Sequence, residues 1–380
     1  MKLLDICDIS GNPVKKFIGN KKYIATGDVI DNVISSYTIV NYDNKPSRAN
    51  VEISKNELLF AKMINTKKVL LSNDDNIKNI YSTGFYCLRP KENVDIKYLY
   101  YLINSKSFNN QKDKNCSGAT QKAISNDGLA KIVISDIPNY NIQKRIANIL
   151  EKIDSLISVK KQQMIKFDEL IKSQFVEMFG NVYINDKKWN VYDKIGNHCI
   201  LNPKKNEISE INKNTLITFL PMQNVSVYGV LDYSIERTIR EVWKGFTYFR
   251  DDDVLFAKIT PCMENGKGAV ARKLKNGIGF GTTEFHVIRP KKEINSIWIY
   301  YVLADKKFRS NAEKNMTGSA GQKRVPISFI ENYKISIPPI ELQNKFADIV
   351  EQIDKQKFEF ENSLKKLEEL QASLMQEYFG

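Results

Sequence analysis

Two stretches of the chain place apolar residues at alternating intervals of three and four, the spacing of helices that pack along one stripe. The stretches run from Gln143 to Phe179 and from Gln343 to Phe379, and neither contains a proline or a glycine. A proline lies shortly before each stretch and a glycine directly follows it, as expected at the two ends of a helix. We therefore expect two long helices, each roughly 55 Å in length at 1.5 Å per residue.

A single helix of this kind cannot bury its apolar stripe alone, so each needs a partner surface. The other helix of the same chain is the nearest partner, and we expect the two to form an antiparallel coiled coil. A coiled coil that serves only as a spacer or a dimerisation device stays open as an alternative. The predicted core of the helix pair consists of Ile146, Leu150, Ile153, Ile157, Phe167, Phe346, Val350, Ile353, Phe360 and Leu367.

The chain also repeats itself at a spacing of about 200 residues. Matching segments occur in the same order in both copies, and so many ordered matches do not arise by chance. They are Thr83-Gly84-Phe85 with Thr283-Glu284-Phe285, Arg89-Pro90-Lys91 with Arg289-Pro290-Lys291, Tyr100-Tyr101 with Tyr300-Tyr301, Ile153-Asp154 with Ile353-Asp354, and Phe179-Gly180 with Phe379-Gly380. A shorter echo relates Leu59–Lys62 to Leu255–Lys258. The sequence thus indicates two copies of one unit, 1–180 and 181–380.

Ahead of each long helix, short runs rich in β-branched and aromatic residues predict strands. The predicted strands are 23–34, 58–63 and 85–88 in the first copy and 216–220, 254–259 and 285–288 in the second, with a helix over 96–108 and over 296–308. We predict an α+β fold, with two similar mixed α/β lobes separated by two long antiparallel helices and related by an approximate two-fold repeat. The expected domains are 1–138, 139–180, 181–337 and 338–380.

The net charge of the chain limits the classes of partner that we expect it to bind. Lys and Arg number 57 against 44 Asp and Glu, which gives a formal net charge of +13. A balance this basic favours a polyanionic partner, either nucleic acid or an anionic membrane surface. No run of about 18 apolar residues is present, so we expect no membrane span. The five cysteines are scattered and the chain starts without a signal-peptide pattern, which predicts a cytoplasmic protein with reduced thiols.

Basic residues gather between the predicted elements. Lys and Arg neutralise phosphates, while Asn, Gln and Arg can make paired hydrogen bonds to base edges. One segment recurs, a Gly/Ser-rich loop ending in Gln-Lys at 117–122 and 317–324, and its backbone N–H groups beside a cation suit a phosphate. A structural turn, or an ordinary solvated loop, is the alternative. The candidate DNA-binding residues are Lys15, Lys16, Lys62, Lys67, Lys68, Gln121, Lys122, Lys204, Lys205, Arg237, Arg240, Lys258, Lys267, Gln322, Lys323 and Arg324.

Catalytic motifs are missing from the sequence. It has no GxxxxGK[ST] phosphate loop, no GxGxxG that follows a strand and opens a helix, and no [DNS]PP[YF] signature of an amino-methyltransferase. With two histidines and no CxxC pair, neither nucleophilic catalysis nor a metal site is predicted. We therefore expect no catalytic residue, no metal and no cofactor in this chain.

The order of lobe, Gly-rich loop with Gln-Lys, Ile-Pro, Gln and a long helix ending in Phe-Gly occurs twice. In this order the chain resembles, over its whole length, the specificity subunit of type I restriction–modification systems. The segment Ile337-Pro338-Pro339-Ile340-Glu341-Leu342-Gln343 looks like the entry to the helices of that family. Asn139-Tyr140-Asn141 in the first copy departs from it, which leaves the start of the first helix less well defined.

The resemblance implies that each lobe is a target recognition domain that reads one half of a bipartite DNA sequence, and that the helices set the unread spacer. It implies two DNA adenine methyltransferase subunits as partners and allows a motor–endonuclease subunit to join. S-adenosylmethionine, and ATP with Mg, would then be used by those partners and not by this chain. Because the lobes differ more than the helices, we expect an asymmetric target.

Three other interpretations stay open. One is a nuclease or methyltransferase fragment, which DNA cleavage or methylation by the purified chain alone would establish. Another is a non-catalytic coiled-coil scaffold without a DNA role, against which a salt-dependent affinity for DNA would argue. The third is a specificity subunit of a methylation-only or other restriction system, which the sequence does not exclude.

Overall fold

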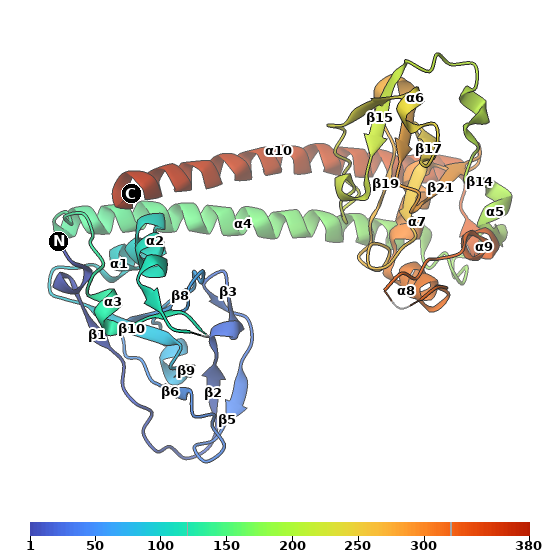
Figure 1. Cartoon of the computed structure of the whole chain (residues 1–380). Coiled ribbons are helices and arrows are strands. Elements are labelled where there is room, and N and C mark those ends of the chain that lie inside the picture. Colours follow the sequence, from blue (N-terminus) through green and yellow to red (C-terminus); the bar gives the residue numbers. More distant parts are fainter. Residues whose placement is uncertain (120, 320) are drawn as a thin grey trace. The chain divides into compact units, whose positions relative to one another are not determined.

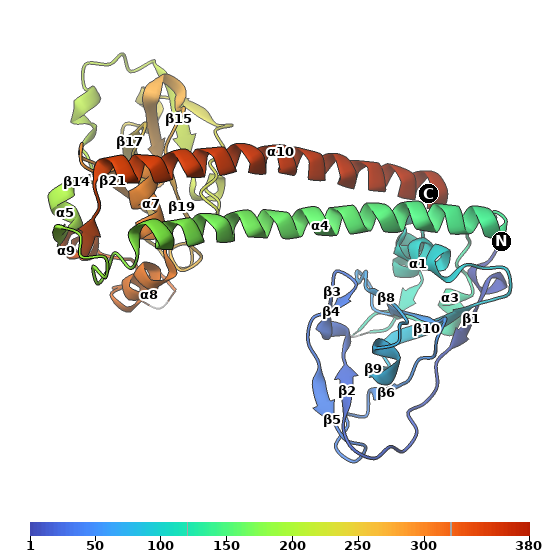
Figure 2. The same ribbon diagram turned by 180° about the vertical axis from the view of Figure 1, so that it is seen from behind.

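The computed structural model describes residues 1–119, 121–319 and 321–380 (Figure 1). The chain divides into two compact units: unit 1 comprises Met1–Gln163 with Phe360–Gly380, and unit 2 comprises Met164–Glu359. Each unit contains one globular lobe and a part of each of two long helices, α4 and α10, which Figure 2 shows from behind. We call the part of unit 1 that precedes α4 lobe 1, and the part of unit 2 between α4 and α10 lobe 2.

Lobe 1 is built on two four-stranded sheets. The first is antiparallel, in the order β1 (Cys7–Ser10), β10 (Phe85–Pro90), β7 (Leu58–Ala61) and β8 (Val69–Leu71). The second contains a parallel pair, β2 with β9, in the order β5 (Thr38–Val40), β2 (Lys21–Ile24), β9 (Ile80–Ser82) and β6 (Ala49–Val51). Two short hairpins join β3 (Val29–Ile30) to β4 (Val33–Ile34) and β11 (Cys116–Ser117) to β12 (Ala123–Ile124).

Lobe 1 also contains short helices, of which the first packs against β7, β8 and β10. They are α1 (Ile96–Asn104), α2 (Lys106–Lys114) and α3 (Asn126–Leu129), with the 3-10 turns η1 (Leu3–Asp5), η2 (Thr26–Asp28) and η3 (Asn76–Lys78). The expectation of one helix over 96–108 was wrong. Two helices form, because Ser105 has an extended backbone and its Oγ accepts the N–H of Phe108 at 3.1 Å, which caps α2. The turn η2 likewise interrupts the strand expected over 23–34.

Lobe 2 repeats the two sheets of lobe 1. Its first sheet has the order β14 (Cys199–Leu201), β21 (Phe285–Pro290), β18 (Val254–Ala257) and β19 (Gly268–Val270). Its second has the order β16 (Glu236–Thr238), β15 (Leu216–Leu220), β20 (Ile278–Gly281) and β17 (Thr247–Arg250), again with a parallel central pair. The register agrees as well, since Cys7 pairs with Pro90 and Cys199 with Pro290. The predicted internal repeat of mixed α/β lobes is thereby confirmed.

Lobe 2 also pairs β13 (Val191–Lys194) with β22 (Lys334–Ile337). Its helices are α5 (Ile195–His198), α6 (Ile239–Val242), α7 (Ser296–Ala304), α8 (Lys306–Lys314) and α9 (Ile327–Asn332), with the 3-10 turns η4 (Lys205–Ile208), η5 (Met222–Asn224) and η6 (Lys275–Gly277). As in lobe 1, the segment expected to form one helix, 296–308, forms part of two helices. They are separated at Asp305, whose side chain accepts the N–H of Lys307 at 2.8 Å.

The two long helices are α4 (Tyr140–Phe179) and α10 (Ile340–Phe379), each of 40 residues. They begin slightly before the expected starts at Gln143 and Gln343 and end at the expected phenylalanines. Within the described part of the chain, no helix is both long and apolar enough to cross a membrane.

In unit 1 the two helices run antiparallel. Asp154 of α4 accepts a hydrogen bond from the side chain of Gln371 of α10. The ammonium nitrogen of Lys161 lies 2.9 Å from a carboxylate oxygen of Glu368. Residue numbers therefore rise along one helix as they fall along the other. In the same unit the ammonium group of Lys160 lies 4.5 Å from the centre of the Phe360 ring, which places the polar interruption of one apolar stripe against an aromatic face.

Unit 2 shows the same antiparallel pairing with different residues. Lys357 of α10 donates to the carboxylate of Asp168 at 2.7 Å, and the rings of Phe175 and Phe346 pack edge to face with centres 5.4 Å apart. Phe346 also contacts the ring of Phe179. The side chains that join the helices thus differ between units, although the backbone pattern is shared.

The predicted core of the helix pair is most buried beside the lobes. Ile146 and Leu150 belong to the hydrophobic core of unit 1, and Phe346, Val350 and Ile353 to that of unit 2. A pair of helices leaves part of each side chain facing solvent where no lobe covers it. Two further residues of the predicted core, Ile153 and Ile157, are buried. The other three are half-buried: Phe167, Phe360 and Leu367.

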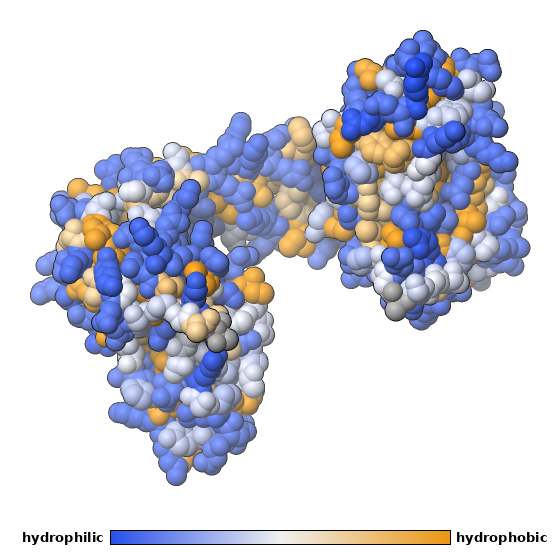
Figure 3. Space-filling view, in the orientation of Figure 1, coloured by the Kyte–Doolittle hydropathy of each residue, from blue (hydrophilic) through white to orange (hydrophobic). Residues whose placement is uncertain are grey.

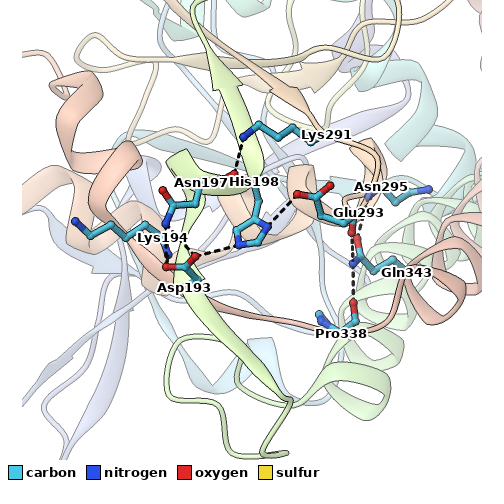
Figure 4. A network of polar contacts seen from close by, with 9 residues as sticks. All are labelled: Asp193, Lys194, Asn197, His198, Lys291, Glu293, Asn295, Pro338 and Gln343. Atoms are coloured by element: carbon cyan, nitrogen blue, oxygen red, sulfur yellow. Dashed lines mark hydrogen bonds and ion pairs between the residues drawn. The ribbon is translucent and has the colours of Figure 1, made fainter.

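A buried glutamine ties the start of each long helix to its lobe. Gln143 donates to the backbone carbonyls of Asn93 at 3.1 Å and Pro138 at 2.8 Å, and accepts the N–H of Asp95 at 2.9 Å. Gln343 makes the same three bonds at the same distances to Glu293, Pro338 and Asn295 (Figure 4). This shared role explains why a glutamine stands at both positions of the repeat.

Candidate nucleic-acid interface

Two sequence motifs that are far apart along the chain meet in each lobe. In lobe 1 the N–H of Ile64 donates to the carbonyl of Lys122 and the N–H of Ile124 donates to that of Lys62, both at 3.0 Å. The Gln-Lys loop is thereby fastened to the Leu-Phe-Ala-Lys motif, which contains the end of β7. Both lysines of these motifs consequently lie at one edge of lobe 1.

Lobe 2 joins the same two motifs in the same way. The N–H of Thr260 donates to the carbonyl of Lys323 at 3.0 Å, and the N–H of Val325 donates to that of Lys258 at 2.9 Å. The sequence predicted the two motifs separately. Their meeting is a tertiary contact that spacing along the chain does not reveal.

Each Gln-Lys loop is the tip of a hairpin that requires glycine. Gly118 and Gly318 have φ values of +129° and +121°, and an added Cβ would lie 2.6 Å from the carbonyl oxygen of Gln121 and 2.9 Å from that of Gln322. Only glycine fits there without strain. Gln121, Lys122, Gln322 and Lys323 are all exposed. Thr120 and Ala320, which belong to the two predicted loops, lie outside the described residues.

The strand lysines behind the loops are half-buried. The ammonium group of Lys62 lies 4.2 Å from the centre of the Tyr86 ring, a cation–π contact. Burial lowers the pKa of Lys62 and of Lys258 from the ordinary value. Because burial disfavours the charged form of each lysine, an anionic group beside either ammonium group would stabilise its charge.

Arg324 follows Lys323 in lobe 2 and is held by Glu284. Its Nε and Nη2 donate to the two carboxylate oxygens at 2.9 and 2.8 Å, and its Nη1 donates to the carbonyl of Gln322 at 3.0 Å. These hydrogen bonds lower the pKa of Glu284 and raise that of Arg324. The guanidinium is therefore fixed in one plane beside the exposed Lys323.

Two other candidate cations have partners inside their own lobes. The ammonium group of Lys68 donates to the carbonyl of Thr26 at 2.7 Å, and that of Lys267 donates to the carbonyl of Met222 at 3.0 Å. In each lobe this bond anchors the 3-10 turn η2 or η5 to the strand that follows the lysine. Lys68 and Lys267 thus hold the fold in place, whereas their neighbour Lys67 is exposed.

The sequence did not reveal the cations that shape the loop beneath each site. Lys112, 1% exposed, donates to the carbonyls of Met63 and Thr66 at 3.0 and 2.8 Å. In lobe 2 the buried Arg309 donates to the carbonyl of Met263 at 3.0 Å. Because the two cations occupy different positions of the repeat, comparison of the two copies gives no signal for them.

The remaining candidates are spread over other surfaces. Lys15 and Lys16 are exposed in the segment between β1 and β2, and Arg237 and Arg240 are exposed in β16 and α6. A cavity of about 320 Å³ in lobe 2 is lined by Lys204, Lys205, Asn202, Phe246 and Tyr248, among others. The ammonium group of Lys205 already donates a hydrogen bond to the carbonyl of Trp243.

The structure brings together Lys62, Gln121 and Lys122 in lobe 1, and Lys258, Gln322, Lys323 and Arg324 in lobe 2.

Metal ligands do not gather anywhere in the described ranges, where no group of three or more His, Cys, Asp or Glu side chains could hold an ion. The candidate interface is the pair of cationic loop sites, one in each lobe, that the backbone hydrogen bonds of the Gln-Lys loops form. Their exposed amide and ammonium groups can donate hydrogen bonds to phosphate oxygens or to base edges.

Comparison with known proteins finds one family. The model described as the type I restriction modification DNA specificity domain matches residues 1–167 and 241–372. The two matched segments together cover most of the chain, and each contains residues of a lobe and of the long helix that follows it.

Two relatives come from Escherichia coli. The specificity subunit of the type I restriction enzyme EcoEI is 46% identical over 142 residues, which are 37% of this chain and 23% of the relative. The specificity subunit of EcoAI is 36% identical over 214 residues, which are 56% of this chain and 34% of the relative. The matched parts thus span about a quarter and a third of the length of these relatives.

A solved structure matches the whole chain. It is the S subunit of a type I restriction–modification system from M. genitalium, with a TM-score of 0.55 and 15% identity, over 100% of this chain and 95% of that one. At this identity the likeness shows a shared fold, which confirms the predicted α+β class with its two lobes and long helices.

Proposed function

The chain belongs to the type I restriction modification DNA specificity family, and on this basis we propose that it selects the DNA target of a type I restriction–modification complex. Each lobe reads one half of a bipartite DNA sequence. The chain itself is not catalytic, and the chemistry belongs to its partners. The domains 1–138 and 181–337 are the two target recognition domains, and 139–180 and 338–380 are the helical spacers.

The observation that carries this proposal is the duplicated cationic loop site. Lys122 and Lys323 are exposed at the same place in two lobes of one fold, and each loop is hydrogen-bonded to the residue that directly follows β7 or β18, Lys62 or Lys258. A net charge of +13 supports binding to a polyanion. Two equivalent sites in non-identical surroundings suit two half-sites of different sequence, and hence an asymmetric target.

We further propose that the long helices fix the spacing of the half-sites and dock two DNA adenine methyltransferase subunits. A continuous helix of 40 residues is about 60 Å long, which suits a rigid spacer. Apolar side chains are exposed along the helices, with Leu156 at 51%, Val159 at 50% and Phe358 at 64%. Apolar patches on a mostly hydrophilic surface are visible in Figure 3, and such patches favour a protein partner.

The partners would supply the reactive cofactors. S-adenosylmethionine would be bound by the methyltransferase subunits, and ATP with Mg by a motor–endonuclease subunit where one joins the complex. A complex without the latter would methylate DNA and would not cleave it. This chain contributes the recognition surfaces and the helices.

The decisive experiment is a methylation map of DNA from cells that carry this chain together with its neighbouring methyltransferase, against cells that lack only this chain. We expect one split, asymmetric methylated motif that disappears when the chain is removed. An unchanged map, with both proteins shown to be expressed, would contradict the proposal and favour a scaffold without a role in DNA recognition.

A further inference from the structure

The guanidinium of Arg324 is fixed on one side and open on the other. Its Nε and Nη2 donate to the carboxylate of Glu284, and one N–H of Nη1 donates to the carbonyl of Gln322. Arg324 is nevertheless 41% exposed at its side chain. Among the described residues, these three bonds leave two of the five guanidinium N–H groups without a protein acceptor.

A guanidinium held in this way is prepared for planar recognition. Its rotamer freedom is already lost in the folded protein, so binding a ligand costs little further ordering. The two remaining N–H groups, one on Nη1 and one on Nη2, lie in the plane of the guanidinium. Paired donors of an arginine can bind the O6 and N7 acceptors of guanine in the major groove, and they can also bind two oxygens of a phosphate. The comparison between the lobes distinguishes these two ligands.

Arg324 has no basic counterpart in lobe 1. Ser117 pairs with Ala123 in the hairpin of lobe 1, and Thr317 pairs with Arg324 in that of lobe 2, so Ala123 occupies the equivalent position. The isolated bridges agree, since Ala123 faces the residue after Lys62 and Arg324 faces the residue after Lys258.

The acid that holds Arg324 is missing from lobe 1 as well. The N–H of Lys62 donates to the carbonyl of Gly84, and the N–H of Lys258 donates to that of Glu284, both at 2.9 Å. Gly84 therefore stands where lobe 2 has Glu284. The arginine and its acid occur together in lobe 2, and neither occurs in lobe 1, which indicates that they act as one unit.

The rest of the loop site is common to both lobes. Gln121-Lys122 and Gln322-Lys323 are exposed at equivalent places. A contact to phosphate serves both lobes equally, because the DNA backbone is the same at each half-site, whereas a contact to a base must differ between lobes that read different sequences. The shared lysines thus fit the phosphate role, and the pair present in one lobe fits base reading.

The charge of the pair supports the same assignment. Glu284 offsets the positive charge of Arg324, so the pair adds little to the attraction between the protein and the phosphates. An arginine that served only as a phosphate contact would be weakened by an acid at 2.8 Å. The acid instead determines the plane in which the two remaining donors lie.

We propose that Arg324 reads a guanine in the half-site bound by lobe 2, and that Glu284 is the positioning residue that sets the plane of its guanidinium. This inference rests on the proposed function. Its experiment is a selection in which the purified full chain binds a pool of double-stranded DNA with randomised bases, and the bound molecules are sequenced.

The wild-type chain should select a split motif with a G·C pair at one position of one half. Arg324→Ala and Arg324→Lys should lose the preference at that position by about 5- to 150-fold, with the other half-site unchanged. Lysine keeps the charge and lacks the paired donors, so it tests planarity and also serves if the alanine variant is unstable. Glu284→Ala should relax the same position without lowering the affinity for mixed-sequence DNA, because a negative charge is removed.

Lys323→Ala is the matched control on the neighbouring residue. It should weaken binding uniformly, reduce the slope of log Kd against log salt by about 1, and keep the motif. If Arg324→Ala behaves in this way, Arg324 contacts a phosphate and the inference is overturned. It is equally overturned if Arg324→Ala and Glu284→Ala lower the Tm and leave the motif intact. A wild-type chain that selects no motif, either alone or together with its neighbouring methyltransferase, would instead remove the proposed function.

Discussion

At the scale of single residues, His286 is buried beneath the Gln-Lys loop of lobe 2. It is 5% exposed, and its Nε2 lies 2.8 Å from the carbonyl oxygen of Val325. Lys258 and Glu284 are the charged groups that influence it. Burial lowers the pKa of its imidazole from about 6.5 to about 4, so the ring is neutral in the folded protein at neutral pH.

Lobe 2 should consequently lose stability as the pH falls from about 6.5 to about 4. The unfolded chain binds the proton at the higher pKa, so the contribution of neutral His286 is complete above pH 6.5 and is lost as the pH falls through the folded-state value. The variant His286→Gln can still donate to Val325 but does not titrate. It should reduce the change in the free energy of unfolding across this pH window by up to ~3 kcal/mol. Urea denaturation at a series of pH values measures this.

The other histidine of the chain provides the control. His198 lies at the surface of lobe 2 between Asp193 and Glu293, with ring nitrogens 3.2 and 3.1 Å from their carboxylate oxygens (Figure 4). The chain has two histidines, so His198→Gln removes the only other imidazole. A profile that flattens in His198→Gln and persists in His286→Gln would show that burial of His286 is not the cause.

The candidate site was only partly predictable from the sequence at this scale. The type and position of Lys122 and Lys323 in a repeated loop indicated an anion site. The sequence pattern could not show that Lys68 and Lys267 are used by backbone carbonyls, since those carbonyls come from segments distant along the chain. Nor could it show the plane of Arg324, which depends on an acid 40 residues away.

At the scale of elements, the buried face of α10 should tolerate no charge. Ile353 is 6% exposed and belongs to the hydrophobic core of unit 2. Ile353→Asp would bury an unpaired carboxylate and should lower the free energy of unfolding by on the order of 3 kcal/mol. Thermal unfolding followed by circular dichroism measures the loss.

Phe358→Asp on the same helix is the matched control. Phe358 is 64% exposed, so its replacement should change the free energy of unfolding by about 0.5 kcal/mol or less. Equal effects of the two substitutions would mean that the helix does not bury the face containing Ile353.

The long helices were the most predictable elements, because their apolar period extends over many turns without a proline or a glycine. Their expected ends at Phe179 and Phe379 agree with the structure. The split at Ser105 was missed, because a serine can either continue a helix or cap the next one. The parallel pairing of β2 with β9 was also beyond the sequence, since it joins strands from distant segments that carry no matching local signal.

At the scale of the whole molecule, the excess of basic residues should make DNA binding depend strongly on salt. Each phosphate contact releases counterions, so the slope of log Kd against log salt counts such contacts. Replacement of both Lys122 and Lys323 by alanine should reduce this slope by about 2, as measured by fluorescence anisotropy with a labelled duplex. An unchanged slope would place the phosphate contacts elsewhere on the lobes.

The joint between helix and lobe has a consequence for inheritance. All three bonds of Gln143, and all three of Gln343, go to main-chain atoms, so they do not depend on which side chains the two lobes carry. A gene segment for a foreign lobe, exchanged by recombination just before this glutamine, would therefore meet a joint that already fits. New combinations of lobes could arise by shuffling, without compensating mutations in the helices.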